Sequence, residues 1–430
     1  MSASNRTSKA ARARPLLPEV RHFIKFVHSR LTPGSSSGDG IWFSRRDEGS
    51  LFLDREERAA YSALITALMK KYVPQDDLSR RSVETFVQDA LFASLDLRER
   101  RKNTLDERID AELQTLLKRL KAPSQPFRCW IAVDGLDRAG LPARFSDVRF
   151  VTFARPHLRE LTKLHSKSSS SFWKVHGKHI RESDLWNHAC AIVTVRARDF
   201  SAAQELGLRR TRQVLDLVNV FSDLIPYNYG WLYLPGDAAR AQRIVPIQRA
   251  ADGAATTSYT TLDPLTAFSW KKLRAERRLF QLFSRLSTLA RKNDDGTCGS
   301  LVTSAAQWIG RATIDRRREE AFLLYAIALE TLMLPGEKSG ELGYRLKVRV
   351  AHLLGRSVAS RTQLAKDISR LYGIRSAIVH AGSYEVTDED LGLLRSVVKR
   401  VLLRLVRSAA LHRLTHDQLS EWFDRRILRR

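Results

Sequence analysis

The part of the chain that follows Asp263-Pro264 has apolar residues that recur at the spacing of an α-helix. Short connections between such segments place consecutive helices side by side and antiparallel. This pattern predicts a C-terminal helical bundle over residues 264–430, and it restricts the fold more than any other feature of the sequence. The expected helices cover Thr266–Lys292, Ser300–Arg311, Asp315–Leu334, Ser339–Leu354, Gln363–Ala381, Thr387–His412 and His416–Leu428.

Several ends of these segments carry residues that start or stop helices. Asp315 is suited to cap the third helix, Pro335-Gly336 to end it, and Gly355 to end the fourth. Thr387-Asp-Glu-Asp390 places a hydroxyl and acidic groups where the first turn of a helix has unpaired N–H groups. These signals support the predicted boundaries.

The region upstream of the bundle has two different characters. Residues 19–122 are mainly helical in pattern, and residues 126–260 contain short β-branched or aromatic segments that alternate with one long helix. Residues 1–18 are expected to form a disordered basic arm. The predicted fold class is therefore α+β, multidomain. The helices expected upstream are Leu51–Lys71, Leu78–Leu95, Thr104–Leu120 and Phe200–Leu224, and the strands are Phe127–Val133, Val148–Phe153, Ala189–Val195, Gly230–Leu234 and Ile244–Ile247.

The formal net charge is +26, from 73 Lys+Arg against 47 Asp+Glu. Such an excess favours a polyanionic partner, nucleic acid before an acidic membrane. The longest apolar run, Ala321–Leu334, contains Glu330 and is too short to cross a bilayer, so no membrane contact is expected. Three separated cysteines form no zinc motif and no disulfide framework, which suits a reducing cytoplasm.

No segment has the spacing typical of a metal or cofactor site. The histidines between residues 165 and 188 are spread over a loop and a strand entrance, and Ser166–Ser171 is more typical of a surface linker than of a phosphate-binding loop. Cofactors are therefore not expected. The histidines concerned are His165, His176, His179 and His188.

The stretch Leu371–Gly382 combines polar side chains with an apolar helical background. Each residue of a helix advances by about 100°, so relative to Tyr372 we expect Arg375 near roughly −60°, Ser376 near about +40° and His380 near about +80°. Arg375 and His380 then border one strip, which must face solvent, a cleft or another subunit. The buried side is expected from Leu371, Ile374 and Ile378.

This stretch resembles the Arg-x4-6-His motif of HEPN domains, named for higher eukaryotes and prokaryotes nucleotide-binding. Its form Tyr-x-x-Arg-Ser-x-x-Val-His-x-Gly is similar to the Apea-like subgroup, as are the upstream segments Ala328–Leu332 and Tyr344–Leu354. The resemblance covers about residues 298–412. Ser376 stands where many HEPN proteins have Asn, Asp or His.

The resemblance implies a metal-independent endoribonuclease whose site forms between two bundles of a homodimer. Arg375 would hold the scissile phosphate of an RNA, such as a tRNA, and His380 would act as acid or base in attack by the 2′-OH. Supporting roles fall to Tyr372, Ser376, Glu330 and Arg349. The family further implies an antiviral-defence or toxin effector in the cytoplasm, regulated by an unknown trigger at the N-terminal domains.

The tail from Leu391 has ten Lys/Arg against three acidic residues, which is typical of a phosphate-binding face. Its predicted RNA contacts are Arg395, Lys399, Arg400 and Arg404.

Plainer interpretations remain open for each of these features. Arg375 would then pair with Glu330 as an ordinary polar contact inside the bundle, and the basic tail would be a solvated face. The chain would be a non-catalytic RNA- or nucleotide-binding or dimerisation module with a HEPN-like fold, or a dimeric scaffold.

Overall fold

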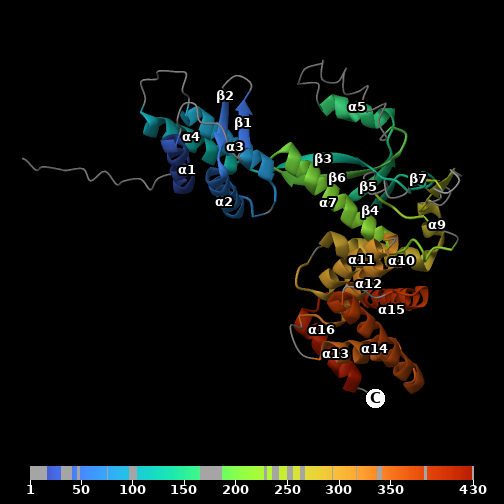
Figure 1. The fold of residues 1–430 in the computed structure, drawn as a ribbon. Helices are drawn as coiled ribbons and strands as arrows, with labels where there is room; N and C mark the ends of the chain where they lie inside the picture. Colours follow the sequence, from blue (N-terminus) through green and yellow to red (C-terminus); the bar gives the residue numbers. More distant parts are fainter. Residues whose placement is uncertain are drawn as a thin grey trace, which may run out of the picture. The chain divides into compact units, whose positions relative to one another are not determined.

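The contacts between residues divide the chain into two units (Figure 1). Unit 1 comprises Met1–Phe127 and Val195–Leu206, and unit 2 comprises Arg128–Thr194 and Gly207–Arg430. The predicted boundary between residues 260 and 264 lies inside unit 2. The structure, a computed structural model, describes residues 17–30, 41–45, 49–74, 76–95, 104–164, 186–226, 230–234, 242–248, 255–261, 267–292, 294–315, 317–336, 341–381 and 385–428. The predicted basic arm, Ser166–Ser171 and three of the four histidines above fall almost wholly outside these residues.

Unit 1 is built on four helices around one apolar cluster. Side chains such as Phe23, Ile65 and Leu113 fill this cluster because their helices present apolar residues along one side. Capping boxes start the second and fourth helices, at Asp54–Glu57 and Thr104–Glu107. The helices are α1 (Pro18–Arg30), α2 (Arg55–Tyr72), α3 (Arg80–Leu95) and α4 (Leu105–Leu120).

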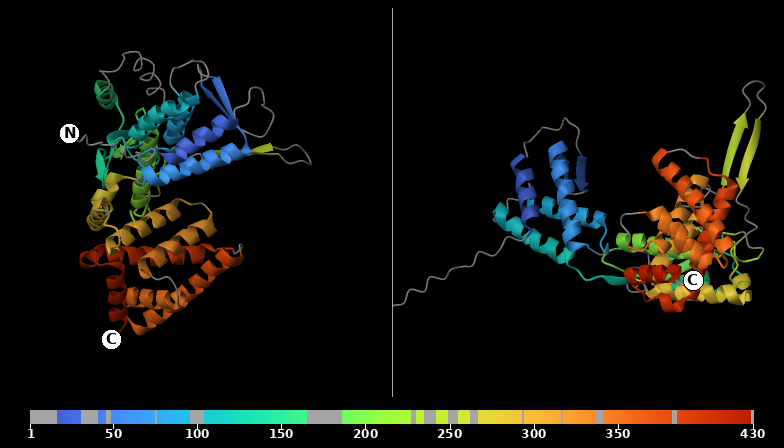
Figure 2. Two further views of the ribbon diagram at one scale, coloured as in Figure 1. Left: turned by 90° about the vertical axis from the view of Figure 1, so that its left-hand side faces the viewer. Right: turned by 90° about the horizontal axis from the view of Figure 1, so that it is seen from below.

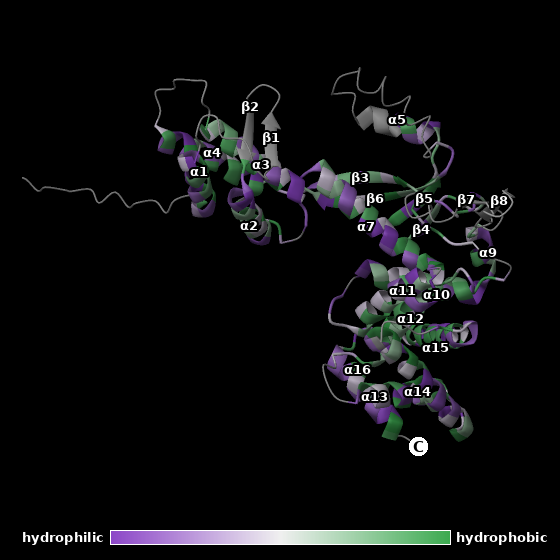
Figure 3. Ribbon diagram, in the orientation of Figure 1, coloured by the Kyte–Doolittle hydropathy of each residue, from purple (hydrophilic) through white to green (hydrophobic). Residues whose placement is uncertain are grey.

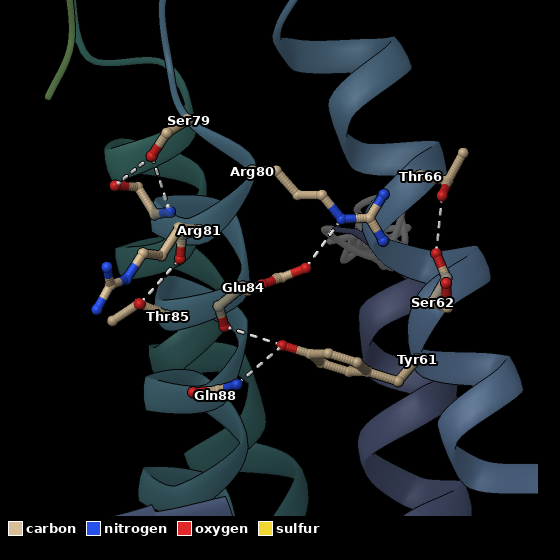
Figure 4. A network of polar contacts seen from close by, with 10 residues as sticks. Tyr61, Ser62, Thr66, Ser79, Arg80, Arg81, Glu84, Thr85 and Gln88 are labelled. Atoms are coloured by element: carbon tan, nitrogen blue, oxygen red, sulfur yellow. Dashed lines mark hydrogen bonds and ion pairs between the residues drawn. The ribbon is translucent and has the colours of Figure 1, made fainter. Parts of the chain in front are cut away.

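A polar network joins α2 to α3 across this unit (Figure 4). The hydroxyl of Tyr61 donates to the carbonyl oxygen of Glu84 at 3.1 Å and accepts from Gln88 Nε2 at 3.2 Å. Burial raises the pKa of Tyr61, so its hydroxyl keeps its proton and remains a donor. The network therefore satisfies a polar group that the core would otherwise bury at a cost.

The helix predicted from Leu51 begins later, at Arg55. The residues before it form an antiparallel hairpin of β1 (Ile41–Arg45) and β2 (Gly49–Leu53). The capping side chain of Asp54 fixes the helix start, and Leu51-Phe-Leu53 before it pairs as a strand with the β-favouring run Ile41-Trp-Phe43.

A small four-stranded antiparallel sheet follows, in the order β3-β6-β5-β4. The prediction of an α+β chain with helical regions is confirmed, and three strands of this sheet, β3, β5 and β6, were predicted. The predicted strand Gly230–Leu234 is wrong: it forms only an isolated bridge, between Asp134 and Tyr233. The strands are β3 (Gln125–Ala132), β4 (Ala143–Phe145), β5 (Val148–Thr152) and β6 (Ala189–Ala197).

Four further elements complete this region. Helix α5 (Arg155–Leu164) and strand β8 (Ala255–Thr261) were not predicted, and β8 pairs with the predicted strand, β7 (Gln242–Gln248), in a separate hairpin. The long helix α7 (Phe200–Asn219) starts at Asp199, whose side chain accepts from Ala202 N at 2.8 Å, and ends before the predicted Leu224.

The rest of unit 2 is a helical bundle, seen from two further sides in Figure 2. Hydrophobic residues gather on α12 and α15 (Figure 3), and α12 packs against α11 and α15. The elements are α9 (Trp270–Ala275), α10 (Arg277–Lys292), α11 (Cys298–Ile314), α12 (Arg318–Met333), α13 (Leu342–Leu354), α14 (Val358–Ala381), α15 (Asp388–Arg407), the 3₁₀ turn η1 (Ala409–Leu411) and α16 (His416–Leu428).

Most predicted helix ends of the bundle are confirmed. Gly355 ends α13, Pro335-Gly336 follows α12, and the side chain of Thr387 accepts from Asp390 N at the start of α15. The predicted role of Asp315 is wrong, because it ends α11 and Arg317 precedes the first turn of α12.

Two of the predicted bundle helices are interrupted. The one expected over Thr266–Lys292 breaks at Glu276, whose backbone leaves the helical conformation between α9 and α10. The one expected over Thr387–His412 ends at Arg407 and continues as η1.

Helix α7 is fastened to the bundle at two points. A Cβ atom at Gly310 of α11 would lie 1.6 Å from the carbonyl oxygen of Asp216, so only glycine allows the two helices to cross this closely. Just beyond α7, Asp223 forms an ion pair with the buried Lys399 of α15. No helix in the described ranges has the length and apolar character needed to cross a membrane.

Candidate functional site

The predicted strip lies on the second half of α14, which packs against α13 and α12. Leu371 and Ile374 are buried, as the helical spacing predicts, and Ile378 is half-buried. Tyr372, Arg375 and Ser376 are half-buried on the other side, and the last turn exposes Val379 and His380. A side chain as apolar as Val379 is 48% exposed, so this part of the surface is open in a single chain.

Arg375 is held by a carboxylate from the neighbouring helix. Its Nε lies 3.2 Å from Glu330 Oε1 of α12, and the two side chains are 27% and 24% exposed. Burial raises the pKa of Glu330, and the charge of Arg375 offsets part of this effect. The pairing predicted by the plainer interpretation is therefore present, but it leaves the guanidinium within reach of solvent.

A small cavity lies beside this ion pair. It measures about 10 Å³, which is room for about one water molecule. A nucleotide cannot enter such a space, so a ligand of this strip must bind on the surface or against a second chain. Its polar lining consists of Glu330, Tyr372 and Arg375.

Tyr372 is fixed by a close approach between α13 and α14. A Cβ atom at Gly343 would lie 3.0 Å from two carbons of the Tyr372 ring, so glycine makes room for the ring at the start of α13. The neighbouring Tyr344 is 56% exposed. Two aromatic rings thus stand near the N-terminal end of α13, one half-buried and one open.

Arg349 does not belong to this strip. Its side chain is 1% exposed, and it donates to Met333 O at 2.8 Å and to Ser420 Oγ at 2.7 Å, with Asp424 Oδ1 at 3.2 Å. These partners tie α13 to the end of α12 and to α16. We therefore correct the predicted orienting role of Arg349 to one in helix packing.

The predicted RNA contacts on α15 divide into two kinds. Lys399 is 5% exposed and its ammonium pairs with Asp223 and donates to Val220 O at 3.3 Å, so its prediction as a surface contact is wrong. Arg395 is 50% exposed and lies 3.8 Å from the other oxygen of Asp223. Arg400 and Arg404 are exposed.

The fold places Arg404 close to Arg426, which is itself close to Arg361, and these neighbours were not predicted from the sequence. Burial, together with the charges of Arg404 and Arg361, lowers the pKa of Arg426. The guanidinium of Arg426 also lies 5.6 Å from the centre of the Trp422 ring. A basic group with an adjacent aromatic ring is typical of surfaces that contact nucleic acid. The only signal in the sequence was the high Arg content of the tail.

Metal ligands are not grouped in this part of the molecule. Within the described ranges, no three His, Cys, Asp or Glu side chains are arranged to hold a metal ion. Comparison with protein families, with curated proteins and with solved structures finds no match for this chain. The arguments for function therefore rest on the chain's own residues and on the resemblance of its motif.

Proposed function

We propose that this protein is a metal-independent endoribonuclease of the HEPN type, with its active site completed by a second copy of the chain. The observation that carries the proposal is the uncovered strip of α14, on which a reachable Arg375 and an exposed His380 follow one another over two turns. The cavity beside them is too small for substrate. Half a site per chain is the arrangement that fits both facts.

In this reaction the ribose 2′-oxygen attacks the adjacent phosphorus, and the bond from phosphorus to the 5′-oxygen breaks. One imidazole takes the proton of the 2′-OH and another gives a proton to the departing 5′-oxygen. A dimer supplies both, because each chain contributes one His380. Arg375 neutralises the charge that develops on the phosphate oxygens, and the products are a 2′,3′-cyclic phosphate and a 5′-OH.

Glu330 is a positioning residue in this scheme. Its carboxylate limits the rotamers of the long Arg375 side chain, so less freedom is lost when the guanidinium binds phosphate. Tyr372 and Ser376 border the same strip and are proposed to contact a base and a phosphate. Arg400 and Arg404 are proposed to hold the RNA strand farther along the bundle.

The N-terminal unit is proposed to regulate the nuclease. An effector that cuts cellular RNA must be silent until a trigger arrives, and four helices outside the bundle offer a separate body for sensing. We place this activity in the cytoplasm, in antiviral defence or as a toxin, on the strength of the motif's resemblance.

The test is cleavage of tRNA, total RNA and single-stranded DNA by the purified full chain in EDTA. Arg375→Ala and His380→Ala are each expected to lower RNA cleavage by about 10²–10⁴. DNA should remain intact because it lacks the attacking 2′-OH. Lys366→Ala, an exposed cation on the same helix, and His22→Ala, an exposed imidazole in unit 1, are the matched controls. RNA cleavage that persists in both site variants rejects the proposed site.

A second function is favoured by the Glu330–Arg375 ion pair itself. An arginine already paired with a carboxylate can serve a bundle that binds RNA or another subunit without chemistry. This module would leave RNA intact, bind it in a salt-sensitive manner, and lose affinity in Arg400→Ala and Arg404→Ala. Light scattering at several protein concentrations distinguishes the dimer that both functions invoke from a monomer.

A further inference from the structure

A second hollow of unit 2 lies outside the α14 strip. It has a volume of about 410 Å³, within the range of about 300–1,000 Å³ that is usual for small-molecule sites. Its walls come from the C-terminal half of α10, the segment that leads into α11, and η1 with the turn after it.

Positive charge dominates this cleft. Arg285, Lys292 and Arg413 line it, against a single carboxylate, Asp294, among the described lining residues. None of these three cations pairs with a carboxylate anywhere in the described part of the chain. Three hydroxyl groups, of Ser284, Thr288 and Thr297, add polar lining. Unpaired cations that converge on one hollow are costly unless an anion joins them.

Two contacts hold the polar groups of the cleft in place. Arg285 Nη1 donates to the carbonyl oxygen of Arg407 at the end of α15, at 3.0 Å. His412 Nε2 lies 3.0 Å from Leu405 O, and because a carbonyl only accepts, the imidazole donates there. Burial lowers the pKa of His412, and the charges of Arg285 and Lys292 lower it further. Arg285 and Lys292 therefore lie close enough to the imidazole to disfavour its charged form.

We infer that this cleft binds a phosphate group through Arg285, Lys292 and Arg413. No Phe, Tyr or Trp is among the described lining residues, and the one ring present, the imidazole of His412, is held by its hydrogen bond to Leu405 O, so the cleft offers no large platform on which a base would stack. The cleft is therefore expected to recognise the phosphate group of its ligand rather than a base. The same chemistry is presented by the phosphodiesters of a nucleic-acid strand and by free phosphate compounds, and the site needs no cleavage at α14 to operate.

The experiment uses a fluorescent single-stranded DNA and the full-length protein, with anisotropy measured over a range of salt concentrations. DNA carries the phosphodiesters but no 2′-OH, so binding is measured whether or not the protein is a ribonuclease. In the double variant Lys292→Gln/Arg413→Gln, affinity is expected to fall roughly tenfold at about 100 mM salt. The slope of log affinity against log salt should fall by about 1.4, from two lost phosphate contacts.

The control is Arg356→Gln/Lys366→Gln, which removes the same charge from two exposed positions, one just before α14 and one on its first half. Asp294→Asn removes the negative charge from the described lining and should therefore strengthen DNA binding. A folding defect would weaken binding, so it cannot produce this result. Competition with inorganic pyrophosphate distinguishes a free phosphate compound from a nucleic-acid strand as the ligand. If pyrophosphate binds and displaces the DNA, the ligand is a free phosphate compound. If it does not, the ligand is the nucleic-acid strand. Equal losses in both double variants, or no binding of either probe, overturn the inference.

Discussion

Two arginines of the bundle, both predicted from the sequence to belong to the candidate site, lie in different surroundings. Arg349 on α13 is 1% exposed and has hydrogen bonds to a carbonyl, a hydroxyl and a carboxylate. Arg375 on α14 is 27% exposed and has Glu330 as its acidic partner. The guanidinium of Arg349 therefore serves helix packing, whereas that of Arg375 remains accessible to a ligand. The number of partners and the burial separate a structural arginine from one that remains partly accessible to solvent.

Replacing Arg349 should have the largest effect on stability. Arg349→Ala removes hydrogen bonds from inside the bundle and leaves the carbonyl oxygen of Met333 buried without that donor. We expect a loss of about 3–5 kcal/mol in the free energy of unfolding, because a buried charged network is broken. Denaturant unfolding followed by circular dichroism measures it. A loss below about 1 kcal/mol would show that the two arginines are equivalent.

The buried ion pair between Lys399 and Asp223 gives the next largest effect. Asp223→Ala leaves the ammonium of Lys399 buried without its carboxylate and should cost about 3 kcal/mol. Lys399→Met keeps the volume, removes the buried charge and should cost much less, because buried pairs are often replaceable by apolar side chains. Equal losses in the two variants, measured by thermal unfolding, would contradict the assignment of Lys399 to the core.

Arg375→Ala should have a small effect on stability. A pair whose side chains are about a quarter exposed is partly screened by solvent and contributes roughly 0.2–1 kcal/mol, so the variant is expected to unfold within about 1 kcal/mol of the parent chain. A loss of RNA cleavage in this variant would then be a property of the proposed site and not of folding. A stability loss as large as that of Arg349→Ala would place Arg375 among the structural arginines.

The smallest effect concerns the pH dependence of Glu330. Because burial raises its pKa in the folded state, the stability that it contributes is fully present below the unfolded pKa of about 4.3 and is lost as pH rises through the folded value. Glu330→Gln removes this titration. The melting temperature of the variant relative to the parent should therefore increase from pH 4 to pH 6.5. A relative melting temperature that falls over this range contradicts a raised pKa.

Helix content was the predictable part of the fold. The bundle helices are amphipathic and several are capped by residues such as Thr387, so local sequence determines where they begin and end. Of the hairpin of β7 and β8, only β7 was predicted. Strand β8 was missed because its Thr-rich run, Ala255–Thr261, has little alternation of apolar and polar residues. Short elements of this kind depend on pairing that spacing alone does not reveal.

The part of the candidate site that lies on one helix, α14, could be predicted from the sequence. Contacts between residues that are far apart in the sequence could not. The placement of Tyr372, Arg375 and His380 on one open strip follows from helical geometry. The burial of Lys399 could not be foreseen, because its partner, Asp223, lies 176 residues away in the sequence. Lysine side chains are usually exposed, and only the tertiary fold shows where one is an exception.

The fastening of α7 to the bundle at Gly310 and Lys399 has a consequence for how the molecule opens. Helix α11 has the glycine crossing and α15 has the buried ion pair, so neither helix can exchange its amide protons independently of the segment that runs through α7 to Asp223. The amides of α11, α15 and the C-terminal part of α7 should therefore share one slow hydrogen-exchange rate, as members of a single cooperative unit. The last turns of α14, near His380, contain neither of these two contacts, so their amides are expected to exchange faster than those of α11 and α15.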